Sequence, residues 1–66
     1  MKIYYLLYQQ YTQIVGVFGS LSECFNWKPE TPPKPPMIIK EVKEFDDGRR
    51  DVNTITTSEH HWTMRK

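Results

Sequence analysis

Five prolines stand within eight residues near the middle of this chain, in PETPPKPP at positions 29–36. Proline has no backbone N–H and a restricted φ, so this segment fits neither the interior of a helix nor a central strand. Lys28 precedes the first proline and is driven toward extended backbone, which ends any helix that approaches it. We therefore expect residues 28–36 to form a rigid connector inside one small fold.

The proline segment has a second interpretation. The pattern Pro29-x-x-Pro32-x-Lys34 fits a polyproline II ligand that an aromatic groove grips, with the lysine setting its orientation. Such patterns arise wherever prolines cluster. The connector is therefore the favoured interpretation, and the polyproline ligand is the alternative.

The length of the chain limits it to a single domain, residues 1–66. A chain of 66 residues buries only about 60% of the surface that its unfolded form exposes, which disfavours a deep catalytic cleft. The longest apolar run, residues 3–8, is far below the ~20 residues of a membrane-spanning helix, and a secretory signal pattern is lacking. We therefore expect no membrane association. Cys24 is the only cysteine, so an internal disulfide cannot form, which favours the reducing cytoplasm.

The charge balance disfavours two classes of function. Nine basic and eight acidic residues give a formal charge of +1. A DNA mimic is strongly acidic, and a protein dedicated to duplex DNA concentrates basic side chains on one surface. Neither composition is present here.

The N-terminal segment predicts a β-hairpin. Residues 2–8, KIYYLLY, are apolar on both alternating faces, which predicts a strand covered on both sides or a central strand with one face at an interface. IVGVF at 14–18 predicts a second strand that returns antiparallel. Gly16 within it predicts a β-bulge, or a gap into which a neighbouring ring packs.

SLSE at positions 20–23 predicts the start of a helix. In a capping box the Ser20 hydroxyl accepts from the Glu23 N–H, and the Glu23 carboxylate reaches back to the Ser20 N–H. Leu21, Cys24 and Phe25 then form one apolar stripe for the sheet. The following Pro29 limits this helix to about two turns.

The segment MIIKEVKEF at 37–45 fits either a helix or a strand. Pro36 delivers it as extended chain, and DDG at 46–48 predicts a turn, so we favour a strand paired with DVNTITT at 51–57 as a partly exposed edge. The tail, residues 58–66, is either frayed or docked through Trp62. The predicted fold class is α+β: a small antiparallel sheet of three to four strands in ββαββ order, one short helix and a Pro-rich crossover.

Three segments, KIYYLLYQQ, IVGVFGSLSEC and IIKEVKEFDDG, together resemble a family of small uncharacterised bacterial and phage proteins. The family pattern is an opening strand, a G-V-F-x-S strand end that caps a helix, and a later I-x-E strand. In that family the helix is longer and richer in alanine, where this chain has its prolines. The resemblance implies a small α+β fold and a phage or mobile-element setting, and it brings no catalytic residues. The matching positions are Gly16, Val17, Phe18, Ser20, Glu23, Ile39 and Glu41.

Large rings are abundant for a chain of this length, with four tyrosines and two tryptophans. Such rings fill a small core or anchor a protein interface, where tyrosine, tryptophan and arginine are enriched. Rings exposed on a sheet also stack on single-stranded bases. We favour a protein partner, with single-stranded nucleic acid as the alternative, and an unpaired sheet edge would also permit a homodimer. The predicted partner-binding residues are Tyr5, Tyr8, Trp27, Arg49, Arg50 and Trp62.

Patterns for catalysis and metal binding are weak. His60 and His61 are adjacent, so their side chains point in different directions and lack the spacing of a metal-ligand set. Cys24 on an apolar stripe is more typical of a small core residue than of a nucleophile. The sequence therefore predicts no enzyme, metal or cofactor. It predicts a small accessory protein that binds and modulates a host or self-encoded protein.

Overall fold

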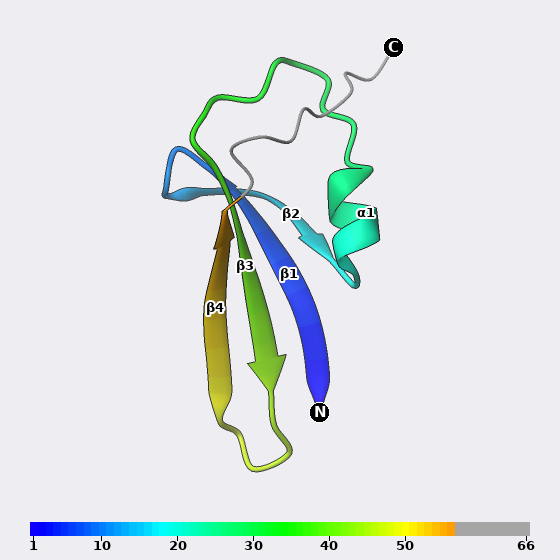
Figure 1. Ribbon diagram of the computed structural model, residues 1–66, viewed down its shortest axis with the longest axis vertical. Helices are drawn as coiled ribbons and strands as arrows, with labels where there is room; N and C mark the ends of the chain where they lie inside the picture. The colour runs from blue at the N-terminus through cyan, green and yellow to red at the C-terminus, as the bar shows by residue number, and fades with distance from the viewer. Residues whose placement is uncertain (57–66) are drawn as a thin grey trace.

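The fold is a small sheet with one short helix, and the computed structural model describes residues 1–56 of the chain. In chain order the elements are β1 (Lys2–Gln9), β2 (Gln13–Phe18), α1 (Leu21–Phe25), β3 (Met37–Glu44) and β4 (Arg50–Thr56). The four strands form one sheet with the order β2-β1-β3-β4, and every neighbouring pair is antiparallel (Figure 1). The small α+β class, with a four-stranded antiparallel sheet and one short helix, is confirmed.

A β-bulge shapes the hairpin between β1 and β2. Leu7 pairs with Gly16 and Tyr8 pairs with Ile14, so Val15 is the extra residue on β2. The ring of Phe18 lies over Gly16, where a Cβ would come within 2.5 Å of the ring atoms Cε2 and Cζ. Both predicted roles of this glycine, bulge and gap for a ring, are present together.

Replacing Gly16 by alanine should lower the free energy of unfolding by about 1 to 3 kcal/mol, because the added methyl overpacks the contact with Phe18. Gly19→Ala is the matched control, since its Cβ meets only Glu23 Oε2, at 3.6 Å. Urea denaturation followed by tryptophan fluorescence measures both changes. The loss from Gly16→Ala should shrink in a Phe18→Leu background. Equal losses for the two glycines would contradict this account.

α1 begins with a capping arrangement that differs in one bond from the prediction. Ser20 Oγ accepts from the Glu23 N–H at 3.1 Å, as expected. The Glu23 carboxylate, however, accepts from the N–H of Gly19 at 3.1 Å and not from that of Ser20. Ser20 is extended, with φ −149° and ψ 158°, and the residue before it is the one whose N–H lies within reach. The helix is also shorter than expected, at five residues.

The core lies between α1 and the sheet. Leu7 of β1, Cys24 of α1 and Ile39 of β3 have no exposed surface and form one cluster. The predicted helix stripe is therefore the side that meets the sheet. The partly buried side chains that pack against this cluster are Tyr5, Val15, Phe18, Leu21, Phe25, Trp27, Met37 and Ile55.

Residues 37–44 form a strand, as favoured, because β3 pairs with β1 along its whole length, from Met37 opposite Gln9 to Glu44 opposite Lys2. The turn to β4 uses Gly48 at φ +90°, a backbone conformation that glycine adopts without steric cost. The Gly48 N–H donates to the Phe45 carbonyl at 3.0 Å. β4 is an edge strand, in agreement with the prediction.

Residues 26–36 connect α1 to β3 and contain no helix or strand. Two hydrogen bonds attach this connector to the end of β1: the Lys34 N–H donates to Gln9 Oε1 at 3.2 Å, and the Gln10 N–H donates to the Pro36 carbonyl at 2.9 Å. Pro29 is buried. The tail at 58–66, with Trp62, His60 and His61, lies outside the described residues.

Candidate binding surface

The two faces of the sheet are covered differently. Side chains alternate along β1, so Tyr5 and Leu7 face the core with α1, whereas Tyr4, Leu6 and Tyr8 lie on the other side. Among the elements of residues 1–56, α1 lies closest to β1 and β2. We call the side of the sheet opposite α1 the open face, because no helix in the described part of the chain covers it.

The open face carries an apolar patch that spans all four strands. Three of its residues are strongly exposed: Ile14 at 50%, Val17 at 64% and Val52 at 55%. They lie on the two edge strands, on either side of the apolar side chains of the central strands, of which Val42 is buried and the others are half-buried. The open-face residues are Lys2, Tyr4, Leu6 and Tyr8 of β1, Ile14 and Val17 of β2, Ile38, Lys40, Val42 and Glu44 of β3, and Arg50, Val52 and Thr54 of β4.

A network of polar side chains lies at one end of the open face. Tyr4 donates its hydroxyl proton to Glu44 Oε1 at 2.7 Å, and Arg50 Nε lies 3.6 Å from the same oxygen. The hydrogen bond from Tyr4, assisted by the charge of Arg50, lowers the pKa of Glu44. The same hydrogen bond, together with desolvation, raises the pKa of Tyr4. The carboxylate is thus held in its charged form by two neighbours.

Near the middle of the open face stands Lys40, on the central strand β3. It pairs directly with Leu6 on one side and Thr54 on the other. Its ammonium lies over the ring of Tyr8, 4.8 Å from the centroid, which is a cation–π contact. Among the described residues of this face, the only carboxylate is that of Glu44, which contacts Tyr4 and Arg50. Lys40 is therefore a central cation within an apolar patch.

The structure does not bring the six predicted partner-binding residues together. Tyr8 and Arg50 lie on the open face. Tyr5 and Trp27 pack against the core on the helix side, where the Tyr5 hydroxyl donates to Glu41 Oε2 at 2.9 Å. Arg49 lies at the β3–β4 turn, and Trp62 is outside the described residues.

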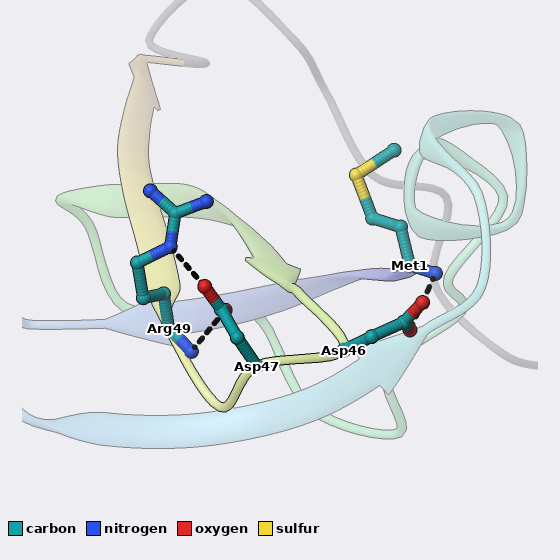
Figure 2. A network of polar contacts seen from close by, with 4 residues as sticks. All are labelled: Met1, Asp46, Asp47 and Arg49. Carbon is teal, nitrogen blue, oxygen red and sulfur yellow. Dashed lines mark hydrogen bonds and ion pairs between the residues drawn. The ribbon is translucent and has the colours of Figure 1, made fainter.

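Arg49 is held by contacts within its own turn (Figure 2). Its Nε donates to Asp47 Oδ2 at 2.8 Å, and its backbone N–H donates to Asp47 Oδ1 at 3.1 Å. Its guanidinium also lies 5.0 Å from the centroid of Phe45. On the same turn, Asp46 Oδ1 lies 3.2 Å from the amino group of Met1. These exposed ion pairs each contribute about 0 to 1 kcal/mol, so they order the turn more than they stabilise the fold.

Sequence reasoning missed the residues that make the open face continuous, above all Val17, Val52 and Lys40. The sequence contains part of this information, because a strand that is apolar on both faces, as residues 2–8 are, must be packed against other groups on both sides. One short helix covers only one face. Assigning Val17 and Val52 to the uncovered side requires the register of each pair, including the bulge at Val15.

The described residues offer little catalytic or metal-binding chemistry. Burial raises the pKa of the Cys24 thiol to about 11, so the thiol stays protonated at neutral pH. Within residues 1–56, no group of three histidine, cysteine or acidic side chains is placed to hold a metal ion. No helix in this part of the chain has the length and apolar character to cross a membrane.

Comparison with protein-family models, curated proteins and solved structures finds no match for this chain. The resemblance to small phage and bacterial proteins therefore stays a prediction.

Replacing Tyr4 by phenylalanine should raise the pKa of Glu44 toward its ordinary value, because the first cause of the lowered pKa is lost. A lowered carboxylate pKa stabilises the fold above the unfolded pKa of about 4.3 and ceases to do so as the pH falls through the folded value. The stability difference between wild type and Tyr4→Phe should therefore shrink on acidification. An NMR titration of the Glu44 side-chain carbon measures the pKa directly.

Tyr5→Phe is the control for this change, since Tyr5 lies on the other face and bonds to Glu41. It should leave the titration of Glu44 unchanged. An equal shift in both variants would contradict a specific Tyr4–Glu44 contact.

Proposed function

We propose that this protein is a non-enzymatic binding module that docks on a protein partner through its open face and thereby modulates that partner. The observation that carries the proposal is the exposed apolar patch of Ile14, Val17 and Val52 around half-buried Leu6 and Tyr8. Contiguous apolar patches on small proteins are typical of interaction sites.

The layout of the open face resembles a protein interface in its chemistry. Apolar side chains and tyrosine rings surround the central Lys40, and one end of the face is polar, where Glu44 and Arg50 are paired. Interfaces combine a desolvated apolar centre with a polar rim, and tyrosine and arginine are enriched in them. Of the predicted partner-binding residues, Tyr8 and Arg50 belong to this surface.

The setting of the proposed function rests on the sequence. The resemblance to phage and bacterial proteins favours a partner encoded by the host or by the same mobile element. A lone cysteine fits the reducing cytoplasm of the host cell. The polyproline-ligand alternative receives no support, because a groove that grips Pro29 and Pro32 needs both exposed, and Pro29 is buried.

Photo-crosslinking tests the docking surface. A benzophenone amino acid at position 17 or 52 should give a saturable adduct with the same protein in a lysate of the host, and excess wild-type protein should suppress it. The matched control is position 22, an exposed serine on the helix. Val17→Asp should abolish the adduct formed at position 52, whereas Ser22→Asp should not. Adducts that are equally abundant at position 22 would contradict the proposal.

A second candidate function, binding of single-stranded nucleic acid, is favoured by one observation. Lys40 lies over the ring of Tyr8 on the open face, and with Lys2 and Arg50 it outnumbers the single carboxylate there. Rings that stack on bases beside cations that meet phosphates are the usual means of binding single strands.

Fluorescence anisotropy with labelled single-stranded DNA and RNA distinguishes the two functions. Nucleic-acid binding predicts saturable affinity that falls steeply as salt is raised, because bound phosphates release counterions. Lys40→Gln should then weaken binding, whereas the control Lys43→Gln should not, since Lys43 lies on the helix side and pairs with Glu41. No change in anisotropy at low salt would exclude this candidate and leave protein docking.

A further inference from the structure

We propose that the outer edge of β4 pairs antiparallel with the β4 of a second copy, so that two sheets join into one continuous eight-stranded sheet. This inference concerns the edge of the sheet and is separate from docking through the open face. It starts from the position of β4, which ends the sheet order β2-β1-β3-β4 among the described residues.

The hydrogen-bond alternation identifies which backbone groups of β4 point outward. The Phe45 N–H donates to the Arg49 carbonyl at 2.9 Å, so this pair is a hydrogen-bonded one. In an antiparallel ladder, bonded and non-bonded pairs alternate. With the observed register, Asp51, Asn53 and Ile55 bond to β3. The N–H and C=O groups of Arg50, Val52 and Thr54 therefore face away from the sheet.

β4 lacks most of the features that protect an edge strand. Its seven residues hold one unbroken register with β3, without bulge, proline or lysine. Only Arg50 and Asp51, at one end, are charged. The opposite edge, β2, is shorter, and it is interrupted by the bulge at Val15. A long, regular edge with exposed Val52 is the one that a further strand can extend.

The occupant is a second copy because β4 is complementary to itself when reversed. In a two-fold pairing centred on Asn53, Val52 lies opposite Thr54 of the second copy, and both have outward-facing backbone groups. Asp51 then lies opposite Ile55 of the second copy, and no like charges meet. A parallel in-register pairing would place each charge beside its own copy, which is unfavourable. The antiparallel pair also covers Val52 and brings the two open faces side by side.

Hydrogen exchange in the wild-type protein tests this pairing without any substitution. The amides of Val52 and Thr54 should exchange several-fold more slowly as concentration rises, because only the dimer bonds them. The amide of Asn53, which bonds to β3 in either state, is the internal control. Exchange of Val52 and Thr54 that is independent of concentration overturns the proposal.

Sedimentation equilibrium gives the second test, from about 5 to about 500 μM, because interfaces below about 1,200 Å² are usually weak. Wild type should pass from monomer to dimer. Thr54→Pro removes an outward N–H and should stay monomeric, while Thr54→Val keeps that N–H and should dimerise. NMR contacts between β3 and β4 establish that the proline variant is folded. A wild-type monomer throughout, or a dimer of folded Thr54→Pro, overturns the proposal.

Neither result depends on the docking partner. Thr54→Pro leaves Ile14 and Val17 in place, so loss of the dimer with retained crosslinking at position 17 separates the edge from the open face. Failure of crosslinking with an intact dimer would count against the docking function alone.

Discussion

The contact of Leu7 with Cys24 and Ile39 is the interaction on which the rest of this structure depends. These three side chains are fully buried, and they come from β1, α1 and β3. A helix of five residues is far too short to be stable by itself, so α1 exists because Cys24 and its neighbours pack on the sheet. The bulge in β2 and the ring of Phe18 over Gly16 bring the edge strand around the same cluster.

The path of the connector, residues 26–36, determines which part of the sheet α1 covers. The connector leaves α1 near β2, is bonded to Gln9 and Gln10 at the end of β1, and then starts β3 beside β1. The four strands of residues 1–56 thereby join one sheet, but α1 stays over β1 and β2. The apolar side chains that face the other way, such as Val17 and Val52, have no helix over them. Within residues 1–56, the open face lacks a covering helix and the outer edge of β4 lacks a neighbouring strand.

Much of the local structure follows from short-range signals. Ser20 and Glu23 predict the start of α1, prolines predict its end, and a short apolar run rich in tyrosine predicts β1. The sequence did not predict that the Glu23 carboxylate accepts from the N–H of Gly19 in place of that of Ser20. This choice depends on the angle at which the chain enters the helix. The distribution of Tyr5 and Tyr8 onto opposite faces follows from alternation, but which face is covered does not.

The sequence by itself determined the hairpin of β1 and β2, the short helix and the proline connector, because these depend on backbone preferences and on neighbours a few residues away. Only the tertiary structure decided that β3 pairs with β1, that Lys40 lies over Tyr8, and that Val17 and Val52 share one uncovered face. Those relations join residues far apart in the chain. They depend on strand register, in which a shift of one residue moves every side chain to the opposite face.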